Sequence, residues 1–495
     1  MTDIAQPVSS RSVTASSWGS SRRRGLILVV LALSQLMVIL DGTIVNIALP
    51  SAEQELGFGA DQRQWVVTAY ALAFGSLLLL GGRLTDLFGR KAAFIVGLAG
   101  FAAASAVAGI AGDFSMLIVG RALQGVFGAL LAPAALSLLS TTFTESRERA
   151  RAFGVFGAVA GAGGAIGLLL GGVLTEYTSW RWCLLVNLVI AAIAIAGAVA
   201  LIPRQLAAAP RPKLDLPGTV LITLGLVGIV YGFSSAGSDG WGSALTIVPL
   251  AVGVVLAVGF VVLETRVAYP LLPMRVVLDR NRGGSYLTIA LVGVALFSVF
   301  LFLAYYLQNV RGYTPLQSGV AFLPLPFAIA ITSTTIAPRL VQRFGPKLPI
   351  VAGTLLGAIS LLLLTGIGIT SNYWLTIAPA LVILGLGMGC VFASTFDAAT
   401  AGVTSEDAGV ASAMVNTAQQ IGGAVGTALL SAIAQGALTG YLADNGTDES
   451  AQTNAQLASY HAAFYSGAAV LVFLLITMLF LLRNSGSASE TTSVA

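Results

Sequence analysis

The chain consists mainly of long apolar runs separated by short breaks that are rich in polar residues, glycine and proline. Each run is close to the roughly 20 residues that an α-helix needs to cross a bilayer, so the pattern predicts an all-α integral membrane protein. Fourteen spans are expected, at residues 25–48, 64–82, 92–111, 115–141, 152–174, 182–203, 217–236, 244–263, 284–308, 317–338, 349–369, 375–396, 409–434 and 461–482. Before the seventh span, Asp215 and Pro217 suit a helix cap and a first helical turn.

The composition agrees with this pattern and excludes several classes of protein. Of the 495 residues, 56% are hydrophobic and only 9% are charged, whereas a soluble domain carries about 25% charged residues. Cys183 and Cys390 fall in separate spans and His461 is the one histidine, so neither a disulfide framework nor a multi-histidine metal site is expected. The spans hold no His/Asp/Glu cluster and no nucleophile with a base, so an enzyme is not expected. We expect no cofactor, and the scattered basic residues argue against nucleic acid as a partner.

The distribution of lysine and arginine predicts the orientation of the chain. With a cytoplasmic N-terminus, 21 of the 25 basic residues fall on the inner side, and only Arg63, Arg181 and Arg311 fall on the outer side. Because excess positive charge marks the cytoplasmic side, both termini are expected inside. The run Gly25–Leu40 follows a basic tail but shows no clear cleavage site, so it is interpreted as an uncleaved first helix. The longest break, Gln435–Ser459, is expected to form a polar outer loop.

A nine-residue segment occurs twice in the chain. RLTDLFGRK at Arg83–Lys91 aligns without gaps to RLVQRFGPK at Arg339–Lys347. The first copy follows the second span and the second copy follows the tenth, so two six-span halves fit if spans seven and eight are an inserted hairpin. Parallel six-helix repeats are typical of a large class of transporters. The expected organisation is a cytoplasmic tail (1–24), an N-terminal six-helix half (25–203), an inserted hairpin with flanking cytoplasmic loops (204–283), a C-terminal six-helix half (284–482) and a second cytoplasmic tail (483–495).

One acid and one base lie deep within predicted spans. Asp41 is in the first span, where a charge costs about 3 kcal/mol even on lenient scales, and Arg121 is the one basic residue inside a span. At the rise of an α-helix, Asp41 lies about 10 Å and Arg121 about 9 Å from the outer ends of their spans. We therefore expect a direct ion pair or a shared polar cavity. Such a pair can simply pin two helices, but apolar packing usually stabilises equally well, which favours a functional role.

Two further motifs involve glycine. In the inner loop GRLTDLFGRK, Gly82 and Gly89 are expected to allow a tight turn. Asp86, Arg90 and Lys91 place both signs of charge on this loop, where they can hold two halves of the protein together in one state and release them in another. The alternative is a solvated loop whose basic residues only set the topology. In the fifth span, glycines recur every three or four residues and form a smooth stripe that allows close helix contact and bending. The stripe comprises Gly157, Gly161, Gly164, Gly167, Gly171 and Gly172.

Together these motifs resemble those of the major facilitator superfamily, and in particular of its fourteen-span drug–proton antiporter family. The similarity covers nearly the whole chain and is carried by LDGTIVNIALP (Leu40–Pro50), the Gly82–Lys91 loop, RALQG (Arg121–Gly125) and SWRW (Ser179–Trp182). The fifth span departs from the family pattern, because Leu168 stands where the antiporter motif usually has a proline, and this removes a built-in kink.

The resemblance implies proton-driven export of drugs or antibiotics by alternating access, in a bacterial plasma membrane and as a monomer. Asp41 would be the proton site and Arg121 would tune it, with the proton gradient as the energy source. A single central acid favours neutral or monocationic amphipathic substrates over dications. The substrate cavity is expected near the bilayer midplane, between the two halves. Its candidate residues are Asn46, Gln124, Phe300, Tyr306, Gln308, Asn416 and Gln420.

Other functions remain open at this point. The absence of the fifth-span proline leaves room for an exporter or flippase of a lipid, an amino acid or another natural product on the same fold. Substrate-stimulated proton movement would distinguish this alternative from drug–proton antiport. A channel fits less well, because two halves with hinge glycines suit alternating access better than a ring of pore-lining repeats.

Overall fold

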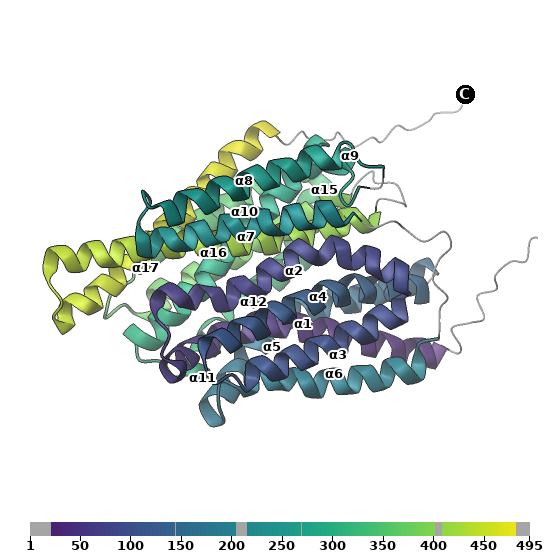
Figure 1. The fold of residues 1–495 in the computed structure, drawn as a ribbon, viewed down its shortest axis with the longest axis horizontal. Coiled ribbons are helices and arrows are strands. Elements are labelled where there is room, and N and C mark those ends of the chain that lie inside the picture. The colour runs from purple at the N-terminus through teal and green to yellow at the C-terminus, as the bar shows by residue number, and fades with distance from the viewer. Residues whose placement is uncertain (1–20, 144, 204–214, 269, 401–407, 482–495) are drawn as a thin grey trace, which may run out of the picture.

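The computed structural model describes residues 21–143, 145–203, 215–268, 270–400 and 408–481, and every regular element within these ranges is a helix. Figure 1 shows the long helices running along the long axis of the molecule, with α1 to α6 in one band and α7, α8, α10 and α16 beside them. Thirteen helices of the described chain are long and apolar enough to cross a membrane, and α5 adds the shorter apolar stretch Gly163–Tyr177. The prediction of an all-α membrane protein with fourteen spans is therefore confirmed.

The first eight spans are single helices. Their bounds are α1 (Ser21–Leu56), α2 (Ala60–Phe88), α3 (Arg90–Gly109), α4 (Phe114–Thr142), α5 (Ser146–Tyr177), α6 (Trp182–Leu201), α7 (Leu216–Asp239) and α8 (Ala244–Glu264). The predicted cap of α7 is present, because the Gly218 N–H donates to Asp215 Oδ1 at 2.9 Å. A single turn, α9 (Met274–Val277), leads into the next span.

The remaining spans are less regular. Their elements are α10 (Arg280–Tyr305), η2 (Tyr306–Val310), α11 (Pro315–Ala321), α12 (Pro324–Ile331), η3 (Thr332–Ile336), α13 (Ala337–Phe344), α14 (Lys347–Leu364), η4 (Tyr373–Ile377), α15 (Ala378–Thr400), α16 (Ala408–Asn445) and α17 (Glu449–Leu481). The tenth span begins at Pro315 and is interrupted near Pro324 and Pro338, because proline lacks the N–H that continues a helix. The wide π-helical turns η2, η3 and η4 are of the kind that often occurs at functional sites.

The predicted outer loop Gln435–Ser459 is wrong. Helix α16 continues to Asn445 and α17 already begins at Glu449, so only a short turn separates them. Gly446 makes that turn with a φ of 86°. The segment is rich in alanine, which has the highest helix propensity, and Ala451 and Ala455 are buried, so both helices extend beyond their most apolar sections.

The packing of the first six helices recurs later in the chain. Helix α1 packs against α5, α2 against α4, and α3 against both α4 and α6. In the same order, α10 packs against α16, α12 against α15, and α14 against both α15 and α17. Helices α7 and α8 pair with each other, and α7 also contacts α2 and α16. Gln64 Nε2 and Trp65 Nε1 of α2 both donate to Ser234 Oγ of α7, at 2.7 and 2.9 Å.

Candidate functional site

Asp41 and Arg121 meet in the interior of the first six helices. Arg121 Nη1 of α4 donates to Asp41 Oδ2 of α1 at 2.6 Å, and the side chains are 1% and 0% exposed. The other carboxylate oxygen, Oδ1, accepts from Gln124 Nε2 of α4 and from Asn187 Nδ2 of α6, both at 2.8 Å. Ser105 Oγ of α3 accepts from the same two amides, at 2.6 and 3.3 Å. Both oxygens of the buried carboxylate are therefore satisfied, as a charge in a low-dielectric interior requires.

The arginine is held from its other sides as well. Arg121 Nε donates to the Val66 carbonyl at 2.9 Å, and Nη1 donates to Gln124 Oε1 at 2.9 Å. The guanidinium carbon lies 4.5 Å from the centre of the Tyr70 ring, an arrangement that allows a cation–π interaction. Backbone carbonyl, ring and carboxylate thus fix the cation between α1, α2 and α4.

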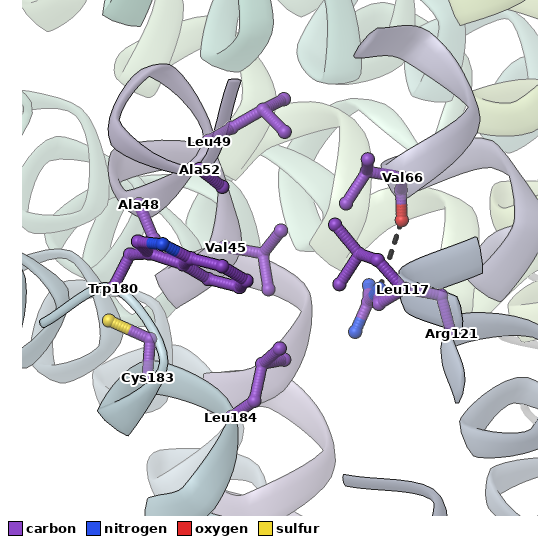
Figure 2. Close-up of a pocket in the computed structure, with 10 residues that line it drawn as sticks. All are labelled: Val45, Ala48, Leu49, Ala52, Val66, Leu117, Arg121, Trp180, Cys183 and Leu184. Carbon is purple, nitrogen blue, oxygen red and sulfur yellow. Dashed lines mark hydrogen bonds between the residues drawn. The ribbon is translucent and has the colours of Figure 1, made fainter. Parts of the chain in front are cut away.

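A small cavity lies beside this cluster, towards the end of the bundle that the charge distribution places outside. It leaves about 10 Å³ for the centres of water-sized molecules, which is room for about one water. Figure 2 shows Arg121 at its edge, facing Val66, with Trp180, Cys183 and Leu184 on the opposite side. The hydrogen bonds above use three of the five N–H donors of Arg121. Apart from Arg121 the lining is almost entirely apolar, so the cavity offers few of the polar partners that a bound water needs.

Sequence reasoning predicted the closeness of Asp41 and Arg121 but missed Asn187, Ser105 and Tyr70. Asn187 is fully buried and sits in the very apolar helix α6. An amide isolated in such a span was a usable signal, because burying it is costly unless it has a partner. Ser105 and Tyr70 gave no comparable signal, since both residue types are common in membrane helices.

The residues predicted for a substrate cavity do not form one cluster. Gln124 belongs to the Asp41 site, and Tyr306 is fully buried and donates to the Gly368 carbonyl at 2.8 Å. Asn46 donates to the Gly42 carbonyl of its own helix at 3.1 Å. Gln308 Nε2 of η2 crosses to the Ile47 carbonyl of α1 at 3.1 Å.

The three other cavity candidates lie on α10 and α16. Phe300 packs against Phe322 with ring centres 5.5 Å apart. Asn416 and Gln420 are half-buried on α16. Gln420 packs close to α2, because a Cβ on Gly75 would lie 2.9 Å from the Cβ of Gln420.

The inner loop differs from the prediction in one respect. Gly89 makes the turn alone, with a φ of 90° that suits glycine, and it separates α2 from α3. Gly82 is not part of the turn, because α2 continues regularly through it to Phe88. Asp86 is exposed near the end of α2, and Arg90 is the first residue of α3.

The two copies of the repeated segment make equivalent contacts. Lys91 Nζ donates to the carbonyls of Val199 and Ile202 at the end of α6. Lys347 Nζ donates to the Leu479 carbonyl near the end of α17, at 2.8 Å. A cation at the last carbonyls of a helix satisfies free acceptors and complements the helix dipole. The lysine of each copy therefore secures the final helix of its own six-helix group.

The glycine stripe of α5 contacts two different helices. A Cβ on Gly167 would lie 2.0 Å from Thr43 Oγ1, and a Cβ on Gly171 would lie 2.9 Å from Ile44 Cγ1. This face of α5 therefore packs tightly on α1. A Cβ on Gly172 would lie 2.6 Å from the Cα of Leu316 in α11. Gly164 has open space around it. The surroundings of Gly157 and Gly161 lie outside the described residues.

Comparisons with known proteins place these features in a family. The family model of the Major Facilitator Superfamily matches residues 31–427. The puromycin resistance protein pur8 of Streptomyces alboniger is 48% identical over 484 residues, covering 97% of this chain and 96% of that protein. The cephamycin export protein CmcT of Amycolatopsis lactamdurans is 37% identical over 452 residues, covering 90% of each.

A solved structure shows the same fold. The bacterial homolog of the human lysosomal transporter Spinster, in an inward-facing and unoccupied conformation, gives a TM-score of 0.65 at 18% identity, covering 94% of this chain and 97% of that one. The family match spans most of the chain and the relatives align over nearly their full lengths. This multi-pass cell-membrane protein therefore belongs to the major facilitator superfamily.

Proposed function

We propose that this chain exports amphipathic antibiotic-like molecules, neutral or singly positive, in exchange for protons that bind at Asp41. The observation that carries the proposal is the fully buried Asp41–Arg121 pair, which lies in a chain closely related to proteins named for antibiotic resistance and export. An ionisable group deep in a membrane protein usually marks an ion or substrate pathway. The proposed energy source is the proton gradient, with no cofactor and with a monomer as the working unit.

Protonation of Asp41 would change the contacts of three helices at once. The ionised carboxylate accepts from Arg121, Gln124 and Asn187. A proton on it removes the charge that pairs with Arg121 and replaces an acceptor position with a donor. The guanidinium then lies buried without a counter-charge, which is strongly unfavourable. Proton binding would therefore favour a conformation in which α1, α4 and α6 pack differently, and substrate binding would favour release of the proton.

The proposed movement is between residues 25–203 and 284–482, with the hairpin in 204–283 attached to both. The recurring helix pairings support two similar six-helix units. The two units approach each other closely at the end where α5 meets α11. A Cβ added to Gly319 of α11 would lie only 2.4 Å from the Leu168 carbonyl oxygen of α5. At the same end the Leu316 N–H donates to Glu176 Oε2 at 3.1 Å. By the positive-inside assignment this closed end faces outwards, and we propose that it opens during transport.

Transport in inverted membrane vesicles tests the proposal. With an imposed proton gradient, puromycin and cephamycin would be added and gradient dissipation recorded. The wild type should dissipate the gradient when a substrate is added, and Asp41→Asn should abolish this while still binding the substrate, as seen by quenching of tryptophan fluorescence. Proton-driven transport at the wild-type rate by Asp41→Asn would refute Asp41 as the proton site.

Asp113→Asn provides the matched control. Asp113 is an aspartate that caps α4 through the Met116 N–H at 2.8 Å, away from the buried cluster. Its substitution should leave coupling intact. If neither compound moves protons but another solute is transported, the alternative of a lipid, amino-acid or natural-product exporter is favoured, as the unusual Leu168 permits.

A further inference from the structure

Two acids face each other at the end of the inserted hairpin. Asp215 precedes α7 and Glu264 ends α8, and their side chains are only 8% and 3% exposed. Asp215 Oδ1 accepts from the Gly218 N–H and Glu264 Oε2 accepts from the Leu272 N–H at 2.8 Å. Each carboxyl group keeps one buried oxygen, Asp215 Oδ2 and Glu264 Oε1, that accepts no hydrogen bond from any residue that the structure describes.

These two free oxygens point into the same space. A Cβ on Gly218 would lie 2.2 Å from Asp215 Oδ2 and 2.8 Å from Glu264 Oε1. The carboxyl groups are close enough to hydrogen-bond to each other. Two ionised carboxylates in such an arrangement repel each other, whereas a single proton between them satisfies both free oxygens.

Within the described part of the chain, the nearby basic side chains are bonded or exposed elsewhere. Among the described residues of the adjoining elements, Arg83 of α2 donates to the Pro270 carbonyl at 3.1 Å, while Arg266 after α8 and Arg275 of α9 are exposed. The pair offers only two free oxygens, whereas a calcium or magnesium ion takes six or more oxygen ligands. The smallest cation, a proton, therefore fits best.

We propose that Asp215 and Glu264 bind one proton between them, which makes a proton-binding site separate from Asp41. The shared proton joins the first turn of α7 to the last turn of α8. Because Glu264 also accepts from Leu272, the proton keeps the segment Pro270–Leu272 in place.

That segment connects several parts of the molecule. Leu271 and Leu272 are buried in a cluster with Phe260 of α8, against Leu79 of α2 and Met414 of α16. The Pro270 carbonyl accepts from Arg83, the first residue of the repeated inner-loop segment. Loss of the proton would therefore loosen the packing of the segment between α2, α8 and α16.

The pH dependence of thermal unfolding tests this proposal on the full-length protein in detergent. The protonated pair stabilises the fold at low pH, and its contribution is lost as the pH rises through the titration of the pair. The wild type should therefore show a fall in Tm that begins as the pH rises above about 4, where the carboxyl groups of the unfolded chain ionise. Glu264→Gln should remove that fall and keep a high Tm at alkaline pH, because its amide donates to Asp215 without a proton while its oxygen still accepts from Leu272.

Three further measurements sharpen the test. Asp279→Asn removes an exposed aspartate that caps α10 and should keep the wild-type pH step, as should Asp41→Asn. Maleimide labelling would use Leu271→Cys in a background in which Cys183 and Cys390 are replaced, with Leu278→Cys as the exposed reference. Relative to that reference, the cysteine at position 271 should react faster at high pH. With Glu264→Gln added, this increase should disappear. Because these assays need no transport, their outcome is independent of the proposed export.

The proposal is overturned if the wild type shows no pH step or if the step persists in Glu264→Gln. It is also overturned if adding sodium or magnesium at constant pH reproduces the stabilisation, since the pair would then be a metal-cation site.

Discussion

At the scale of single residues, Asn187 helps to hold the Asp41 carboxylate. It is one of three side chains that donate to the carboxylate, and its donor atom lies 2.8 Å from Oδ1. Donors to an ionised carboxylate favour the charged form. Under the proposed proton coupling, loss of this neutral amide on α6 would weaken the competition of Arg121 with a proton for Asp41.

Asn187→Ala should shift this competition towards the proton. We expect the pH of half-maximal puromycin binding to rise, because the carboxylate loses a donor and is protonated more easily. We also expect a stability loss of about 1–3 kcal/mol, because Asp41 and Ser105 lose a buried partner. Puromycin titrations at several pH values and thermal unfolding measure the two effects. Ser360→Ala, which removes a buried hydrogen bond to the Ala380 carbonyl, should lower stability without moving the pH midpoint.

The part of this site that could be predicted depended on charge. A lone acid and a lone base in apolar spans require each other, and helix rise placed Asp41 and Arg121 at similar depth. The bond of Gln124 to Asp41 could not be predicted, because sequence does not show which way a side chain points around its helix. Contacts that depend on helix rotation, such as those of Tyr70 and Ser105, require the packed structure.

At the scale of elements, the glycines of α5 determine how near its neighbours can come. Gly172 lies where α5 meets the backbone of α11, and Gly164 has open space. The stripe was predicted from spacing, but which helix each glycine faces was not. Likewise, the spans were predicted from hydropathy, whereas the full lengths of α16 and α17 were not, because a helix need not end where the membrane does.

Gly172→Ala should hinder closure of the α5–α11 end. The added Cβ would meet the Leu316 Cα at 2.6 Å and the Pro315 carbonyl at 2.9 Å, and backbone atoms cannot move aside as a flexible side chain can. We expect slower puromycin transport at unchanged membrane abundance, measured in vesicles and by immunoblot. Gly164→Ala makes the same substitution in the same helix and should transport normally. Equal rates in the two variants would show that this contact does not limit transport.

At the scale of the whole molecule, a cation–π contact joins the two six-helix groups at the same end. Arg63 of α2 forms an ion pair with Glu53 of α1 at 3.0 Å, and its guanidinium carbon lies 3.9 Å from the centre of the Tyr305 ring of α10. Tyr305 is fully buried. A cation–π contact away from water contributes about 0.5–2 kcal/mol, so it can stabilise the closed end relative to an open one.

Arg63→Ala should therefore populate the open end more, by about two- to thirty-fold. Leu316→Cys would place a cysteine in the α5–α11 contact. A larger open population would then appear as faster labelling of this cysteine by a membrane-impermeant maleimide. Tyr305→Leu should give a similar increase, and the double variant should add little, because both changes remove the same contact. Arg311→Ala is the matched control, since Arg311 also lies at this end but donates to the Ile369 carbonyl within the second helix group. If Arg311→Ala accelerates labelling as much as Arg63→Ala does, general loss of positive charge explains the effect and the Arg63–Tyr305 contact does not hold the end closed.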